Sequence, residues 1–169
     1  MIIRREKPSE FQAIHDFVKV AFKTAKVSNG EEQDYVDNLR DSGNYIPELA
    51  LIAESDGKIV GHLMLTRTFV VTSDSREEAL LLAPLSVALD YRKRGIGSGL
   101  VVESFRLAKG LGYTVVFVVG DPAFYGRFGF MPSVLFKIKH VPPIPEENVM
   151  VTELFAGALN GVAGTVTFT

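Results

Sequence analysis

The spacing of hydrophobic positions predicts helices in the first quarter of the chain. One amphipathic face is formed by residues that recur at helical intervals, namely Phe11, Ile14, Val18, Ala21 and Phe22. Pro8 precedes them, and proline is favoured in the first turn of a helix because its missing N–H is not needed there. We also expect a short strand over 2–5 and a second helix over 31–40, with Ser28 and Glu31 as a capping pair.

The pattern changes near residue 48, where short apolar segments separated by polar turns predict β-strands. The expected strands are Leu49–Glu54, Ile59–Val71 and Ala79–Ala88. The first turn contains Asp56 and Gly57, a pair that suits a tight turn between antiparallel strands. We therefore expect an antiparallel meander in this part of the chain.

A parallel pair of strands should follow the meander. A glycine-rich segment leads into a helix that ends near Lys109, and the apolar strand Thr114–Val119 comes next. A strand, a helix and a buried strand in this order form a βαβ unit, whose two strands pair in parallel. A short helix should then begin at Asp121. Further β-rich stretches are expected in the tail, at Val134–Ile138, Val149–Leu154 and Thr165–Phe168.

Composition and charge narrow the class of protein. The chain has 169 residues, the usual size of one domain, so a single domain over 1–169 is expected. Its formal net charge of -2 leaves no basic excess for binding nucleic acid. The longest apolar run, Ala79–Leu85, is far shorter than the roughly 20 residues that a membrane span needs. Since no signal peptide is visible, we expect a cytoplasmic protein without nucleic-acid or membrane partners.

The residue types present also limit the chemistry. Cysteine is absent, which excludes disulfides, thiol nucleophiles and zinc–cysteine sites. The histidines, His15, His62 and His140, are far apart and form no HExxH pattern. We therefore expect no metal site. Because the chain has neither a cysteine nor a GxSxG motif, we also expect no covalent enzyme intermediate.

The strongest local motif is the basic, glycine-rich turn Tyr91–Leu100 between a strand and a helix. Glycines at a helix N-terminus let backbone N–H groups approach an anion closely, and the helix dipole favours negative charge there. Three consecutive cations, Arg92, Lys93 and Arg94, add attraction for phosphate. The turn therefore predicts phosphate or pyrophosphate binding.

Three phosphate-binding motifs can be compared with this turn. The Walker A pattern is absent, and the dinucleotide pattern GxGxxG requires glycine where the chain has Leu100. The pattern [Q/R]-x-x-G-x-[G/A] is met at every fixed position by Arg92, Gly95 and Gly97. A dinucleotide-binding oxidoreductase remains an alternative, because Asp121 follows a strand at a distance that suits a ribose-binding acid.

Two motifs together resemble a known family. Leu85-Ser86-Val87 precedes the turn, and Tyr125 is followed by Gly129-Phe130 in a Tyr-x-x-x-Gly-Phe segment. With the order of the elements along nearly the whole chain, they resemble the GCN5-related N-acetyltransferase (GNAT) superfamily, and within it a bacterial branch of predicted N-acetyltransferases.

The resemblance implies an α/β (α+β) acyl-CoA N-acyltransferase fold with a mixed, mostly antiparallel sheet flanked by helices. It also implies a cleft where the fourth and fifth strands splay apart. Pro84 gives this physical support, since proline cannot donate to a strand ladder and pairing there should be irregular. The co-substrate implied is acetyl-CoA, and the acceptor is a small-molecule or peptide amine.

The resemblance also assigns roles to residues. Backbone groups of Leu85 and Val87 would pair with the pantetheine arm, and backbone N–H groups from Arg92 to Ser98 would hold the pyrophosphate. The residues implied in acetyl-CoA binding are Leu85, Ser86, Val87, Arg92, Lys93, Arg94, Gly95, Ile96, Gly97, Ser98, Phe124 and Arg127. Tyr125 is expected to be the general acid that protonates the departing CoA thiolate, because a phenol stays protonated at neutral pH.

The residues that bind the acceptor amine are less clearly indicated by the sequence than those that bind acetyl-CoA. The acid-rich segment Asn29–Glu48 could attract a cationic amine, which makes Glu31, Glu32 and Asp34 candidates for substrate binding. His62, on an expected strand, is a further candidate, while no general base is identified. A second hypothesis is a non-catalytic acyl-CoA-binding module on the same fold. The β-rich tail also offers a strand edge through which a homodimer could form.

Overall fold

The computed structural model describes residues 1–25, 28–141 and 144–168. Its helices are α1 (Phe11–Phe22), α2 (Glu32–Asp41), α3 (Ile96–Gly110) and α4 (Pro122–Tyr125). Its strands are β1 (Ile2–Arg5), β2 (Ala50–Ser55), β3 (Lys58–Val71), β4 (Arg76–Val87), β5 (Val115–Val119), β6 (Met131–Pro132), β7 (Ile138–His140), β8 (Val149–Glu153) and β9 (Gly164–Thr167). Among the described residues, no helix combines the length and the apolar character needed to cross a bilayer.

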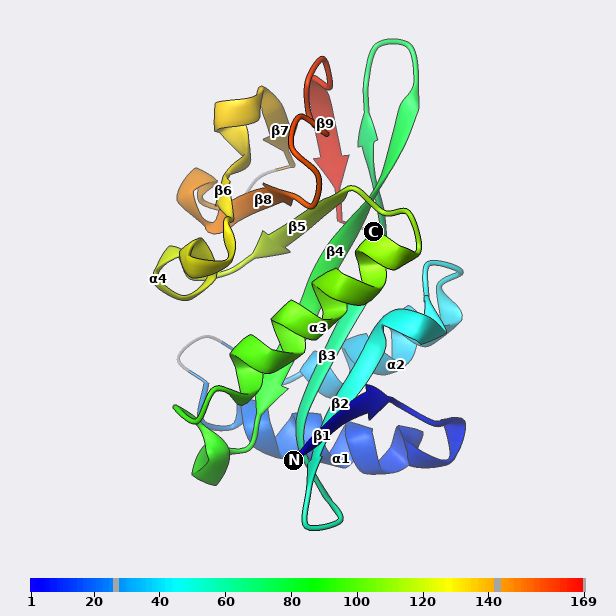
Figure 1. Ribbon diagram of the computed structural model, residues 1–169, viewed down its shortest axis with the longest axis vertical. Helices are drawn as coiled ribbons and strands as arrows, with labels where there is room; N and C mark the ends of the chain where they lie inside the picture. The colour runs from blue at the N-terminus through cyan, green and yellow to red at the C-terminus, as the bar shows by residue number, and fades with distance from the viewer. Residues whose placement is uncertain (26–27, 142–143, 169) are drawn as a thin grey trace. The chain divides into compact units, whose positions relative to one another are not determined.

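The strands form one sheet in the order β1-β2-β3-β4-β5-β8-β6, and β9 pairs with both β3 and β7 (Figure 1). Most pairs are antiparallel, whereas β4–β5 and β7–β9 are parallel. The β4–β5 pair joins Leu80–Leu82 to Val116–Val118, as the βαβ pattern predicts. The expectation of a mixed, mostly antiparallel sheet is therefore confirmed.

The chain divides into two compact units. Unit 1 comprises Met1–Leu65 and Pro84–Leu107, and unit 2 comprises Thr66–Ala83 and Ala108–Thr169. Strands β3 and β4 contribute residues to both units. The single domain over 1–169 remains a prediction.

In unit 1, helices cover both faces of β2 and β3 (Figure 1). The apolar faces of α1 and α2 pack on one side, in a core of Ile14, Val18, Val36, Leu39, Ala50, Ile52 and Met64. Alternate strand residues face the other side, where α3 comes so close to Gly61 that a Cβ there would lie 2.9 Å from Leu100 Cδ1. A strand without a side chain at this point therefore lets the first turns of α3 lie directly on the sheet.

In unit 2, the final strand closes the core. The buried residues are Val70, Ala79, Leu81, Val115, Phe117, Ile138, Val151, Leu159 and Val166. Strand β9 pairs antiparallel with Phe69–Val71 of β3 and in parallel with β7. Thr68 Oγ1 also donates to the Thr167 carbonyl at 2.6 Å. Segments from opposite ends of the unit's sequence therefore complete one core.

The structure bears on two expectations for the tail, the strand at Val134–Ile138 and the strand edges open to a second copy. The β-rich prediction for Val134–Ile138 is wrong, because Ser133–Phe136 forms a 3-10 turn and Lys137 has a left-handed backbone with φ of 61°. An extended strand cannot pass through that turn, so the strand starts at Ile138. The strands β8 and β9 are each paired on both sides, so the open tail edges are the short β6 and β7. A homodimer formed through the described part of the tail would pair along one of these short edges.

Candidate functional site

The glycine-rich turn of unit 1 leads from a 3-10 turn at Leu89–Tyr91 into α3. Lys93 and Gly95 have left-handed backbones, with φ of 62° and 81°, which turn the chain sharply before the helix. The N–H of Gly99 donates to the Gly95 carbonyl at 2.9 Å. The N–H groups just before Gly99 therefore lie at the open N-terminal end of α3, where the backbone suits an anion.

Arg92 has a structural role within unit 1. Its guanidinium donates to the carbonyl of Val87 at 3.1 Å and to that of Ala21, near the end of α1, at 2.8 Å. Its backbone N–H donates to the Leu89 carbonyl at 3.3 Å. Arg92 thus joins the end of β4, the glycine-rich turn and the C-terminal end of α1. Its Nε, its Nη2 and its backbone N–H all donate to protein carbonyls.

The next two cations are exposed to solvent. Lys93 and Arg94 both lie on the surface, and the Arg94 guanidinium is 5.1 Å from the centre of the Tyr91 ring. Gly97 and Ser98 follow in the first turn of α3, beside the buried Ile96. The turn therefore combines exposed cations with backbone N–H groups at the start of the helix.

Leu85, Ser86 and Val87 form the end of β4 in unit 1. Leu85 and Val87 are half-buried, whereas Ser86 is 5% exposed and its Oγ has no hydrogen-bond partner in the described residues. Just beyond the strand, the N–H of Ala88 donates to the Val60 carbonyl of β3 at 2.9 Å. Because strand side chains alternate, Leu85 and Val87 share one face and Ser86 takes the other.

A buried charged cluster in unit 1 was not foreseen from the sequence. Glu6 follows β1 and accepts two hydrogen bonds from Arg40, at 2.9 and 3.0 Å. It accepts a third from the Tyr45 hydroxyl at 2.7 Å, and its Oε1 lies 2.9 Å from His62 Nε2. The side chains of Glu6 and His62 have no exposed surface. His62, a candidate for substrate binding, is therefore buried in a network and presents no surface of its own to solvent.

The network holds Glu6 in its ionised form. Burial alone would raise the pKa of Glu6, but hydrogen bonds from His62, Arg40 and Tyr45 outweigh it and hold the pKa at about 2. An ionised carboxylate can only accept hydrogen bonds, so the hydrogen in the contact with His62 belongs to Nε2. His62 Nδ1 is buried and has no partner in the part of the chain that the structure describes.

The acidic candidates lie around the start of α2. Glu31 occupies the N-cap position without a capping bond from its side chain, so the predicted Ser28/Glu31 capping pair is wrong. The Ser28 hydroxyl pairs instead with the carboxylate of Glu32. Asp34 is exposed one turn into the helix. The three acidic side chains therefore share one end of α2, as a substrate-attracting rim would require.

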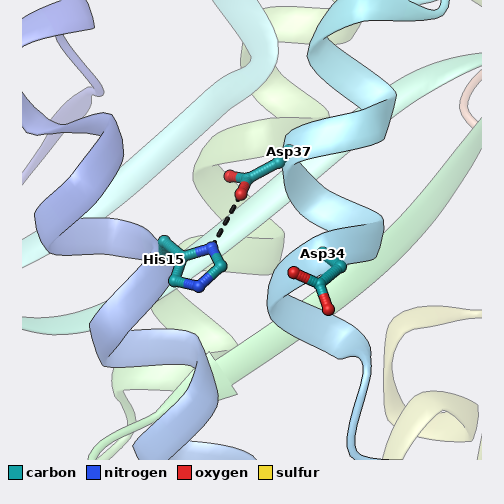
Figure 2. A group of neighbouring side chains, drawn as sticks. All are labelled: His15, Asp34 and Asp37. Carbon is teal, nitrogen blue, oxygen red and sulfur yellow. Dashed lines mark hydrogen bonds and ion pairs between the residues drawn. The ribbon is translucent and has the colours of Figure 1, made fainter.

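One group in unit 1 could hold a metal ion. His15 on α1 and Asp34 and Asp37 on α2 offer ligand atoms that all lie within 4.8 Å of one another (Figure 2). His15 Nδ1 is 2.7 Å from Asp37 Oδ2, and the other oxygen of Asp37 accepts from Arg40 at 3.2 Å. His15 and Asp37 thus contact each other directly, and Asp37 also accepts from Arg40, so two of the three side chains are already engaged with protein partners and we assign no metal to the group.

Tyr125 lies in unit 2 at the end of α4. Its ring meets Phe124 and Phe130 edge-on, with centroids 4.9 and 5.7 Å away. Burial raises the pKa of Tyr125 to about 12, because a phenolate would be poorly solvated there. The hydroxyl therefore stays protonated throughout the neutral range, as the role of a proton donor requires.

The residues around Tyr125 hold the short helix in place. Asp121 caps α4 by accepting from the Ala123 N–H at 2.9 Å, which confirms the expected helix start. Arg127 donates to the Phe124 carbonyl at 3.0 Å, and its guanidinium lies 4.5 Å from the centre of the Phe124 ring. Both candidates for acetyl-CoA binding in this segment therefore contact each other.

Gly120 is a residue whose importance the sequence alone did not reveal. A Cβ at this position would lie 2.7 Å from Tyr125 Cδ2 and closer still to Cε2. Its backbone cannot easily move away, because Asn148 bonds both its N–H, at 2.9 Å, and its carbonyl, at 3.0 Å. Glycine is therefore needed here to seat the Tyr125 ring.

We expect Gly120→Ala to destabilise the protein by about 1–3 kcal/mol, because the ring of Tyr125 must be displaced to make room. Urea unfolding measures this change. Gly126→Ala is the matched control, since it lies in the same segment, has an ordinary helical backbone and has open space for a Cβ. Equal stability of the two variants would contradict the packing argument.

Comparisons with known proteins find similar acetyltransferases. The family model described as an acetyltransferase (GNAT) domain matches residues 2–133. The uncharacterised N-acetyltransferase YhbS of Escherichia coli K12 is 31% identical over 169 residues, covering 99% of this chain and 96% of that protein. The uncharacterised N-acetyltransferase YjhQ of the same organism is 38% identical over 120 residues, which span 70% of this chain and 66% of YjhQ.

Solved structures show the same fold. The crystal structure of E. coli YhbS in complex with CoA has a TM-score of 0.88 at 30% sequence identity, covering 99% of this chain and 89% of that one. A GNAT family acetyltransferase from Brucella melitensis, in complex with acetyl-CoA, has a TM-score of 0.80 at 24% identity, covering 99% and 95%. The similarity therefore extends over both units of the chain.

Proposed function

Because the chain belongs to the GNAT family of acetyltransferases, we propose that it transfers an acetyl group from acetyl-CoA to a primary amine. Both substrates are bound together, and the amine attacks the thioester carbon directly. The C–N bond forms as the C–S bond breaks, and the CoA thiolate leaves. No acyl-enzyme intermediate is needed, since the chain has no cysteine and no GxSxG motif.

The observation that carries this proposal is the glycine-rich turn. Left-handed Lys93 and Gly95 and the open N-terminal end of α3 suit a pyrophosphate, and the exposed Lys93 and Arg94 side chains add positive charge. The CoA bound in the YhbS crystal structure supports the same class of ligand. The backbone of Leu85 and Val87 pairs with the pantetheine arm, and the N–H near Val87 polarises the thioester carbonyl.

Tyr125 is the general acid in this proposal. Its hydroxyl gives a proton to the CoA thiolate as the thiolate leaves. A phenol with a pKa of about 12 remains a proton donor at every physiological pH. Phe124 packs against the Tyr125 ring and Arg127 against Phe124, and both are assigned to the donor substrate. Glu31, Glu32 and Asp34 are assigned to attraction of the amine.

A thermal-shift titration tests the donor. Acetyl-CoA at about 100 times its Kd should stabilise the protein by roughly 2.7 kcal/mol, whereas NAD and NADP should not. Each of a panel of primary amines, including polyamines, lysine peptides and free peptide N-termini, is then added with acetyl-CoA. Release of the CoA thiol is followed with a thiol reagent, and mass spectrometry identifies the acetylated amine.

The outcomes separate the alternatives. Acetylated amine together with free CoA supports the transferase. Stabilisation by acetyl-CoA without CoA release for any amine would favour the non-catalytic acyl-CoA-binding module. Stabilisation by a nicotinamide dinucleotide alone would favour the oxidoreductase and overturn the proposal.

A further inference from the structure

The Arg92 side chain differs from the two cations that follow it in the glycine-rich turn. Lys93 and Arg94 are exposed, whereas Arg92 is half-buried and its guanidinium bonds two backbone carbonyls of unit 1, those of Val87 and Ala21. A guanidinium binds a phosphate best through two parallel N–H groups. Because Nε and Nη2 of Arg92 already donate to the protein, these contacts indicate a role for the side chain other than direct binding of phosphate.

The positive charge of Arg92 has its counterpart at the end of α1. This helix ends at Phe22, and the last four carbonyls of a helix have no partner within it. The carbonyl of Ala21 is one of them, and it accepts from Nη2 at 2.8 Å. A cation at this end is also favoured by the helix dipole. The charge is therefore accounted for without a ligand, and the contact holds the guanidinium in one orientation.

The other contact of Arg92 helps to hold the peptide group between Val87 and Ala88 at both ends. The carbonyl of this peptide accepts from Arg92 Nε at 3.1 Å, and its N–H donates to the Val60 carbonyl of β3 at 2.9 Å. The C=O and N–H of a trans peptide point in opposite directions, so the Val87 carbonyl points away from β3. The N–H and C=O of one strand residue point to the same side, so the Val87 N–H points away from β3 as well.

We propose that Arg92 is a positioning residue that holds the Val87 backbone so that its N–H can polarise the thioester carbonyl of acetyl-CoA. The inference rests on the proposed function, in which this N–H stabilises the negative charge that forms on the thioester oxygen as the amine attacks. Such a donor is effective when its direction is fixed before the reaction, because no reorganisation is then needed in the transition state. Arg92 acts through the Val87 backbone and does not touch the substrate.

The chemistry of the motif agrees with this role. The pattern that the turn meets admits glutamine or arginine at position 92. Both side chains carry an N–H on the nitrogen bonded to Cδ, which is Nε in arginine and Nε2 in glutamine, but only arginine is charged. Nε is the atom of Arg92 that donates to the Val87 carbonyl. The property common to the two residue types is therefore the donor that holds Val87, and not a charge for phosphate.

Three substitutions of Arg92 separate the N–H donor from the charge. Arg92→Gln keeps a donor at the place of Nε, Arg92→Lys keeps the charge but has a carbon there, and Arg92→Met keeps only an unbranched stem. With saturating acetyl-CoA and the amine that the panel identifies, Arg92→Met and Arg92→Lys should lower kcat about 100-fold. Arg92→Gln should stay within about threefold of wild type, and all three should bind acetyl-CoA with a Kd within about twofold of wild type.

Urea unfolding separates positioning from stability. Arg92→Gln and Arg92→Met both lose the bond to Ala21, so they should lose similar stability and yet differ in kcat. Arg106→Gln is the control, because Arg106 pairs with Glu103 on the surface of α3 and should leave kcat unchanged. Full activity in Arg92→Lys with a raised Kd for acetyl-CoA in Arg92→Gln would overturn the proposal in favour of a phosphate ligand. Wild-type kcat in all three variants, or a kcat that follows stability in Arg92→Gln and Arg92→Met, would overturn it as well.

NMR of the wild-type protein tests the contact without any amine. A scalar coupling across the hydrogen bond should join Arg92 Nε to the carbonyl carbon of Val87, and it should persist when acetyl-CoA is added. Loss of this coupling on binding, or a coupling of the guanidinium to CoA phosphorus in its place, would overturn the positioning role even if acetyl transfer is found. Absence of transfer to any amine while the coupling persists would overturn the proposed function, and the positioning role with it.

Discussion

Replacing Tyr125 with phenylalanine should lower kcat for acetyl transfer by about 1,000-fold. Phenylalanine keeps the ring contacts with Phe124 and Phe130 but has no proton for the departing thiolate. Steady-state kinetics measures the loss, and isothermal titration should find the Kd for acetyl-CoA within about twofold of wild type, because the lost interaction acts in the transition state. The activity of wild type should not fall on the alkaline side because of Tyr125 until the pH nears 12.

Tyr113→Phe is the control for this experiment. Tyr113 also belongs to unit 2 and is partly buried, but it lies before β5 and away from α4 in sequence. Its variant should keep wild-type kcat. A Tyr125→Phe enzyme with nearly normal kcat would remove Tyr125 from the mechanism and leave its hydroxyl without a chemical role.

Substituting Glu6 with glutamine should destabilise the protein by about 3–5 kcal/mol. The change removes the carboxylate that pairs with Arg40, and it leaves the Arg40 guanidinium, whose side chain is 7% exposed, without its partner inside the protein. Urea unfolding at neutral pH measures the loss. Glu103→Gln is the control, because Glu103 pairs with Arg106 on the surface of α3 and should contribute little.

The same carboxylate predicts how stability depends on pH. An unfolded glutamate titrates near 4.5 and Glu6 in the folded protein near 2, so the stabilisation is complete above about pH 4.5. It is lost as the pH falls from there toward 2, by about 3 kcal/mol in total. Wild type should lose this amount between pH 5 and 2 relative to Glu6→Gln. Parallel stability curves for the two proteins over that range would contradict the assignment of the pKa to Glu6.

Local patterns predicted the elements of this fold well. The helical spacing of Ile14 and Val18 marks a face that is fully buried in α1, and Asp56-Gly57 forms the turn between β2 and β3. The glycine-rich turn also has the predicted strand before it and the predicted helix after it. These features depend on neighbours in sequence, so the periodicity and turn chemistry are sufficient to find them.

Features that depend on distant residues were missed. Glu6, Arg40 and His62 come from a strand end, a helix and another strand, and no spacing rule links them. The bonds from the Arg92 side chain to the carbonyls of Val87 and Ala21 were likewise not predicted, although the turn that contains Arg92 was. Near Val134–Ile138, β-branched and apolar composition predicts a strand, but the left-handed Lys137 interrupts it. In each case a tertiary contact or one backbone angle decided the outcome.

The pairing of β9 with β3 has a consequence for how the protein is made. Phe69–Val71 emerge from the ribosome long before their partners Thr165–Thr167, and the buried residues of unit 2 include Val166 itself. Until β9 is synthesised, this edge of β3 and the apolar side chains beneath it stay uncovered, which is a hazard for aggregation. Unit 2 can therefore complete its fold only after β9 has been synthesised, and until then the nascent chain suits chaperones that shield apolar segments.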